Sequence, residues 1–175
     1  MPSRLRVPFG YLLGIVVVAL AHPTSASLAA GGAIAAAGEA IRLWASGHID
    51  KTRALATGGP YAHTRNPLYL GSFVMAIGVA VAAASPWVAL AVAVYFAAFY
   101  PSVMHEEAAF LRGRFPEEYA AWAADVPLFL LRLTPAGPRA TRFEWSRVRR
   151  NREWQTALAL PLVAAVLWAR GRWLP

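Results

Sequence analysis

The chain has 175 residues, and its composition excludes an ordinary soluble domain. Hydrophobic residues make up 58% of it and charged residues only 15%, whereas roughly a quarter of an average globular protein is charged. A soluble fold with so few charged side chains could not cover its surface. The sequence contains no cysteine, which excludes disulfides, thiolate metal ligands and cysteine nucleophiles.

Two long runs without charged residues indicate membrane helices. The run between Arg6 and Glu39 holds 32 residues, and the run between Arg65 and Glu106 holds 40. A helix needs only about 20 residues to cross a bilayer core of ~30 Å. Each run is therefore predicted to form a helical hairpin.

Proline marks the turn of each hairpin. Pro23 interrupts the first run and Pro86 the second, and proline ends a helix while pushing the preceding residue out of the helical region. The sequence therefore predicts an all-α, polytopic membrane bundle with four core spans, at roughly 7–22, 26–45, 67–85 and 86–105.

The arginines predict the orientation of this bundle. Arg4 and Arg6 precede the first span, and nine arginines lie within 106–152, whereas the turns at Pro23 and Pro86 carry no basic residue. Because cytoplasmic loops retain positive charge, we expect the amino terminus and the segments 46–66 and 112–152 to be cytoplasmic.

The amino-terminal segment also fits a second interpretation. Two arginines, an apolar stretch ending at Ala21 and the small residues Ser25, Ala26 and Ser27 resemble a cleavable secretory signal. We expect the segment to be retained, because its removal would leave an odd number of spans.

The carboxyl-terminal region, 136–175, is predicted to be a basic interfacial segment followed by a short apolar helix. The apolar stretch 154–168 has arginines at both ends, so it either spans the membrane or re-enters it. We expect the basic segment to bind anionic membrane lipids rather than nucleic acid, because its arginines alternate with aromatic residues beside a membrane. These are Arg139, Arg142, Phe143, Trp145, Arg147, Arg149, Arg150, Arg152 and Trp154.

Polar residues gather at equal distances from the turn at Pro86. Arg65 and Asn66 lie about 20 residues before it, and Glu106 and Glu107 lie about 20 residues after it, so both pairs should be ~30 Å from the turn. An antiparallel hairpin would bring a cation, an amide and two carboxylates together at the cytoplasmic interface.

The segment before the third span is rich in glycine, proline and tyrosine. It reads Gly-Gly-Pro-Tyr-Ala-His-Thr-Arg-Asn-Pro-Leu-Tyr-Leu-Gly over 58–71, which predicts a shaped loop leading into a helix with Pro67 in its first turn. No metal site is predicted beside it, because His105, Glu106 and Glu107 are consecutive and point about 100° apart around a helix.

These blocks resemble the isoprenylcysteine carboxyl methyltransferase and phospholipid methyltransferase group of membrane enzymes. The resemblance covers roughly 50–135 and rests on the 59–71 segment, on Glu106-Glu107, and on Phe115-Pro116-Glu117-Glu118-Tyr119 followed by Val126-Pro127. It implies a methyltransferase-like domain over 1–135, with a cytoplasmic site for S-adenosylmethionine and a small hydrophobic or lipid-like methyl acceptor.

By the same resemblance, the cofactor pocket would be lined by Tyr61, Arg65, Asn66, Pro67, Tyr69, Glu106 and Glu107. Arg65 and Asn66 would be the catalytic residues. The family pattern has Arg-His-Pro where this chain has Arg65, Asn66 and Pro67, so the role of the histidine ring does not carry over.

Two other functions remain open at this point. A membrane reductase of a sterol-like or lipid substrate would use a similar loop and helix to bind NADPH, and a non-enzymatic membrane assembly protein would share the composition. The sequence shows no evident basic site for the extra phosphate of NADPH, which favours methyl transfer. It does not identify the acceptor.

Overall fold

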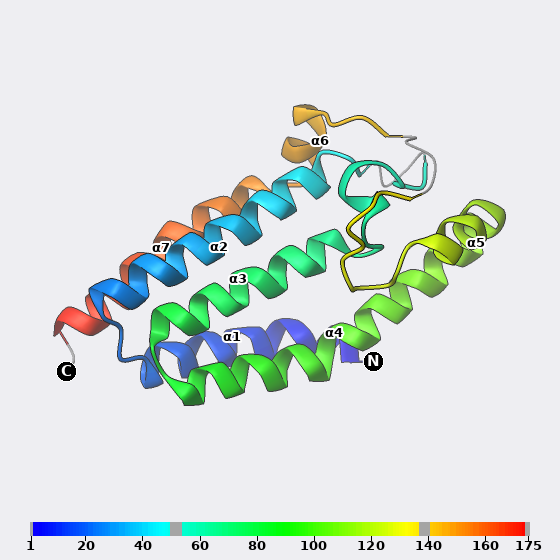
Figure 1. The fold of residues 1–175 in the computed structure, drawn as a ribbon. Coiled ribbons are helices and arrows are strands. Elements are labelled where there is room, and N and C mark those ends of the chain that lie inside the picture. Colours follow the sequence, from blue (N-terminus) through cyan, green and yellow to red (C-terminus); the bar gives the residue numbers. More distant parts are fainter. Residues whose placement is uncertain (1, 50–53, 137–140, 174–175) are drawn as a thin grey trace.

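A computed structural model describes residues 2–49, 54–136 and 141–173 of the chain. The described residues form helices and contain no strand, so the predicted all-α fold is confirmed (Figure 1). Arg139 of the predicted basic segment lies outside the described residues. The helices are α1 (Pro2–Leu20), α2 (Ser25–Ser46), the 3-10 helix η1 (Gly59–Ala62), α3 (Pro67–Ala83), α4 (Pro86–Arg114), α5 (Pro116–Asp125), α6 (Trp145–Arg150) and α7 (Trp154–Trp173).

Both predicted turns are present, but only the second run forms a packed hairpin: α3 contacts α4, whereas α1 packs against α4 and α2 against α3 (Figure 1). Between α1 and α2, Thr24 and Ser27 exchange hydrogen bonds through a backbone N–H and a side-chain oxygen each, at 2.9 and 3.1 Å, which caps α2. Between α3 and α4, Ala84 adopts a left-handed conformation (φ +48°) and Pro86 occupies the first turn of α4. A short helix, α5, begins at Pro116, with Glu117 and Glu118 in its first turn.

The long helices form a bundle with its loops gathered at one end. Figure 1 shows α1 beside α4, α7 beside α2, and α3 between these pairs, with α5 and α6 at the end opposite the carboxyl terminus of α7. Helix α7 has 20 residues and ends against the α1–α2 turn, where Arg170 donates to the Val18 carbonyl at 3.1 Å. The expected apolar segment 154–168 is therefore part of a longer helix that runs the length of the bundle.

Helices α2 and α3 are in backbone contact along a row of glycines. A Cβ atom added to Gly38 would lie 2.6 Å from the backbone nitrogen of Met75, and one added to Gly78 would lie 2.5 Å from that of Ala35. Gly31 is similarly closed off by Gly78 and Ala82. Only glycine permits this approach, which membrane helices use widely for packing.

We expect Gly31→Ala to destabilise the bundle and the adjacent Gly32→Ala to leave it unchanged or slightly more stable. The added methyl at 31 forces α2 from α3, at about 1–3 kcal/mol, whereas nothing lies within 4 Å of a Cβ at 32. Thermal unfolding in detergent, followed by helical circular dichroism, measures both. Equal melting temperatures for the two variants would contradict the proposed contact.

The four predicted spans all form helices, but they do not all meet a membrane-crossing criterion on their own. Among the described residues, one helix, α4, is long and apolar enough by itself to cross a bilayer. The apolar parts of α1 (Leu5–Leu20) and α3 are shorter than about 20 residues. Helix α2 is long enough, but Glu39 and Arg42 lower its hydropathy.

Arg42 joins α2 to α3 and α7 through a buried network. Its guanidinium lies 2.6 Å from the Glu153 carboxylate on the turn before α7, and it also donates to the Ser72 hydroxyl at 2.5 Å and to the Leu68 carbonyl at 3.3 Å. Glu39, three residues before Arg42, is farther away at 3.9 Å. Its carboxylate oxygens are buried and have no hydrogen-bond partner among the described residues. The Arg42 guanidinium is thus the shared counterion of two buried carboxylates.

Candidate functional site

A cavity of about 470 Å³ lies at the loop-bearing end of the bundle. Residues of η1, α3, α4 and α5, together with the loops before η1 and before α3, form its wall. Six residues singled out from the sequence line it: Tyr61, Arg65, Asn66, Pro67, Tyr69 and Glu107. Two helix ends that are about 40 residues apart in sequence therefore meet in one wall, at the depth expected from the hairpin.

Glu106 does not line the cavity. Its side chain is exposed. Because consecutive residues point about 100° apart on a helix, only one of the two adjacent carboxylates can face the cavity, and it is that of Glu107.

Helix α5 holds the Gly-Pro-Tyr loop in place. The indole nitrogen of Trp122 donates to the Tyr61 carbonyl at 2.9 Å, and the Arg65 guanidinium donates to the Tyr119 hydroxyl at 2.8 Å. Tyr119 and Trp122 are three residues apart and share the buried face of α5. The short helix thus fixes both the loop backbone and the direction of the arginine.

The segment that follows α5, at Pro127 and Leu128, is hydrogen-bonded to the residues just before α3. The Arg65 N–H donates to the Pro127 carbonyl at 2.9 Å, and the Asn66 side-chain amide donates to the Leu128 carbonyl at 2.8 Å. Asn66 is buried at the amino-terminal cap of α3, but its side chain does not cap that helix. Its amide nitrogen is therefore used to hold the loop, which leaves its carbonyl oxygen as the group available to a ligand.

Arg65 retains hydrogen-bonding capacity. Its Nε atom is buried and has no hydrogen-bond partner among the described residues, while one terminal nitrogen is bonded to Tyr119. A buried donor without a partner costs free energy unless a ligand satisfies it. The planar fork of a guanidinium suits a carboxylate, so the cavity has a place for an anionic group.

Two of the lining residues, Tyr69 and Glu107, belong to a cluster with Arg6 and Tyr100. The Tyr69 hydroxyl is hydrogen-bonded to both Glu107 and Arg6. The Arg6 guanidinium also lies over the Tyr100 ring, 5.9 Å from its centroid, and the Tyr69 and Tyr100 rings meet edge to face at 5.6 Å. A residue of α1 thus helps to hold the cavity carboxylate.

Tyr61 lies in η1 with its phenol against the cavity. Burial, and next the negative charge of Glu107, raise the pKa of this phenol well above its usual value. The hydroxyl therefore stays protonated at neutral pH and is able to donate a hydrogen bond.

Several lining residues were not predicted from the sequence. They are Ile49, Ala54, Leu55 and Ala56 before η1, Leu68 on α3, Phe110, Leu111 and Arg114 on α4, and Phe115 and Trp122 at α5. Phe110 and Arg114 lie three and seven residues after Glu107, so the 3.6-residue period of α4 could have identified them. The residues before η1 follow no period, and no sequence signal marks them.

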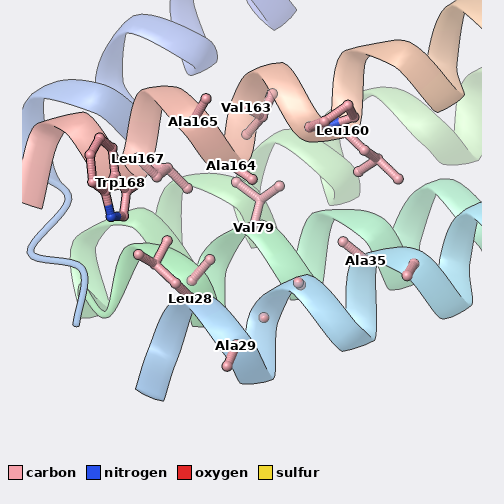
Figure 2. Close-up of a pocket in the computed structure, with 16 residues that line it drawn as sticks. Leu28, Ala29, Ala35, Val79, Leu160, Val163, Ala164, Ala165, Leu167 and Trp168 are labelled. Atoms are coloured by element: carbon pink, nitrogen blue, oxygen red, sulfur yellow. The ribbon is translucent and has the colours of Figure 1, made fainter. Parts of the chain in front are cut away.

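A second, larger space is apolar and lies away from these polar groups. Figure 2 shows this groove of about 650 Å³ between α2, α3 and α7. Glycine, alanine, leucine, valine, proline and tryptophan line it, including Gly31, Ala35, Val79, Leu160 and Trp168. None of these side chains can bind a proton, a metal or a phosphate, so the chemistry is to be sought in the cavity at the loop end.

The described residues thus form a helical bundle with a partly polar cavity at its loop-bearing end. Residues 10–118, more than half of the chain, match the phospholipid methyltransferase family. The chain belongs to this family, which confirms the resemblance seen in its motifs. The match includes the Tyr61–Tyr69 block and Glu107, but not Arg6 or α6.

Two curated relatives are named for metal resistance. The nickel-cobalt-cadmium resistance protein NccN of Alcaligenes xylosoxydans xylosoxydans is 31% identical over 140 residues, which are 77% of this chain and 65% of the relative. The cobalt-zinc-cadmium resistance protein CzcN of Cupriavidus metallidurans is 37% identical over 95 residues, 53% of this chain and 44% of the relative. The chain thus covers less than two thirds of either relative. No solved structure matches it significantly.

Proposed function

We propose that the chain is a membrane methyltransferase that binds S-adenosylmethionine in the cavity at the loop end and methylates a small hydrophobic or lipid-like acceptor. The observation that carries this proposal is the meeting of Arg65 and Glu107 in one cavity, within the segment matched by the methyltransferase family. The cavity volume lies in the range of small-molecule sites, about 300–1,000 Å³.

The cavity residues fit the charges of this cofactor. The guanidinium of Arg65 suits its carboxylate, and Glu107 suits its ammonium or a ribose hydroxyl. The faces of Tyr61, Tyr69 and Trp122 suit an adenine ring or a positively charged sulfonium. When bound, the cofactor supplies a methyl group already activated for transfer.

The contribution of the chain to catalysis is mainly alignment and exclusion of water. Arg65 and Asn66 lie on a loop that α5 and the 127–129 segment hold rigid, so they can fix the cofactor against an acceptor. Phe110, Leu111 and Phe115 give the same cavity an apolar side. A hydrophobic acceptor would enter along this side, laterally from the bilayer.

We also propose that the bundle spans the membrane several times, with the cavity at the cytoplasmic surface. Large apolar side chains are exposed along the outer faces of the long helices, among them Ile15 (67%) on α1, Trp87 (66%) on α4 and Leu162 (66%) on α7. Such faces are stable in lipid and not in water. The charge asymmetry of the loops supports the orientation.

The topology is open to a direct measurement, because the chain has no cysteine of its own. Single cysteines placed at Thr24, in the turn between α1 and α2, and at Ala84, in the turn between α3 and α4, should react with a membrane-impermeant maleimide added from outside the cell. A cysteine at Glu117 should react only after the membrane is opened. Labelling of all three positions from the cytoplasmic side would contradict the orientation.

Equilibrium binding tests the proposed cofactor. The purified chain should bind S-adenosylmethionine, and binding should not be displaced by NADPH. Preferential binding of NADPH would support the membrane reductase alternative. Binding of neither compound would support a non-enzymatic assembly role.

The names of the relatives suggest a setting for this activity. We propose that methyl transfer by this chain contributes to resistance against divalent metals such as nickel, cobalt and cadmium. Expression of the chain in a sensitive host should raise the metal concentration that stops growth, and Arg65→Ala should abolish the gain. Full resistance with the Arg65→Ala variant would separate resistance from methyl transfer.

A further inference from the structure

A short basic surface lies outside both the cavity and the family match. It is formed by α6 and the residues on either side of it. Arg142, Arg149 and Arg152 are exposed there, and their side chains make no hydrogen bond or ion pair with any residue that the structure describes. This sets them apart from Arg42 and Arg65, which are held by buried partners.

The two acids of this segment are bound by other arginines, Glu153 by Arg42 and Glu144 by Arg147. Glu144 is bound by Arg147, whose guanidinium lies 2.8 Å from its carboxylate. Both partners of this ion pair lie within the same helical turn. Three positive charges on a stretch of about ten residues are therefore presented outward.

Two exposed tryptophans flank the same arginines. Trp145 is 67% exposed and Trp154 is 51% exposed. A tryptophan that faces water over so much of its ring is unfavourable in an ordinary protein surface. The boundary between lipid and water suits it, because the ring is apolar and its N–H is polar.

The surface has a fixed place on the bundle. The Glu144 N–H donates to the Gly47 carbonyl at 3.0 Å, and the Asn151 amide donates to the Ser46 carbonyl at 2.9 Å. These bonds hold α6 against the carboxyl-terminal end of α2, at the loop-bearing end of the bundle (Figure 1). In a bundle that crosses a bilayer, this end lies at the level of the lipid headgroups.

We propose that Arg142, Trp145, Arg149, Arg152 and Trp154 form a docking surface for the headgroups of anionic phospholipids. Unpaired guanidinium groups complement the phosphate charge, and the tryptophans insert beside them at the boundary of the hydrocarbon layer. The inference does not depend on methyl transfer. It requires only that the bundle resides in a membrane.

Native mass spectrometry of the full chain in an uncharged detergent tests this surface. The chain should retain phosphatidylglycerol more tightly than phosphatidylcholine of the same chain length. Each of Arg149→Gln and Arg152→Gln should weaken phosphatidylglycerol binding about fivefold at low salt, and the double variant should weaken it further. Arg172→Gln is the matched control, since it removes an exposed arginine beside a tryptophan at the other end of the bundle.

Several results would overturn the proposal. They are equal retention of the two lipids, an unchanged affinity in the double variant, and an equal loss in Arg172→Gln. Complete displacement of phosphatidylglycerol by millimolar glycerol phosphate would assign the surface to a soluble anion instead. Tighter binding of a DNA duplex than of phosphatidylglycerol would assign it to nucleic acid. Circular dichroism of each variant verifies that the fold is retained.

Discussion

Replacing Arg42 by methionine should strongly destabilise the protein. The change leaves Glu39 and Glu153, each only 5% exposed, without their shared cation, and it removes the bonds to Ser72 and Leu68. Removing one partner of a buried ion pair costs about 3–5 kcal/mol, because an uncompensated charge stays buried. Unfolding in detergent, followed by circular dichroism, should show this loss.

A second variant tests whether the stability lost in Arg42→Met comes from buried charge or from lost packing. The triple change Glu39→Leu, Arg42→Met and Glu153→Leu replaces the whole network by apolar side chains, which is often neutral or stabilising. It should recover most of the stability that Arg42→Met loses. Failure of the triple variant to recover any stability would mean that Arg42 acts through its shape or its bond to Ser72. Arg172→Met, at an exposed arginine, should have no effect.

Arg65→Ala should weaken S-adenosylmethionine binding by roughly 10- to 150-fold, because one charge-assisted hydrogen bond contributes about 1.5–3 kcal/mol. Glu107→Gln should have a similar effect. Glu106→Gln is the matched control, since it removes the same charge one residue away from a side chain that faces out of the cavity. Isothermal titration calorimetry with the purified variants measures all three.

The two cavity residues should also be coupled. Because both residues would contact one ligand, the double variant Arg65→Ala with Glu107→Gln should differ clearly from the sum of the single changes. An unchanged affinity for S-adenosylmethionine in both Arg65→Ala and Glu107→Gln would contradict the proposed site. An effect of Glu106→Gln equal to that of Glu107→Gln would show that general charge, rather than contact, governs binding.

The turns and the meeting of Arg65 with Glu107 could be predicted because both depend on short-range signals. Proline fixes where each helix ends, and a constant rise per residue then fixes the depth of every later side chain. Which residues act as ligand contacts stays a prediction.

Other features needed the three-dimensional structure. The choice of Glu107 over Glu106 depends on the rotation of α4 about its axis, which an apolar helix with almost no polar face does not reveal. The pairing of Arg42 with Glu153 joins residues 111 positions apart, and no local pattern in the sequence indicates it. The role of α7 as a full-length member of the bundle was hidden by Pro161 and by the arginines near its end.

The length of α4 makes the cavity sensitive to bilayer thickness. From Pro86 to Glu107 the helix rises roughly 32 Å at 1.5 Å per residue, close to the ~30 Å hydrocarbon layer. If the bundle spans the membrane as proposed, Glu107 lies at the boundary between lipid and water. In a membrane a few ångströms thicker, the helix must straighten or the lipid must thin to keep this carboxylate hydrated. The thickness of the membrane would thus set the distance between the cavity and the hydrocarbon layer.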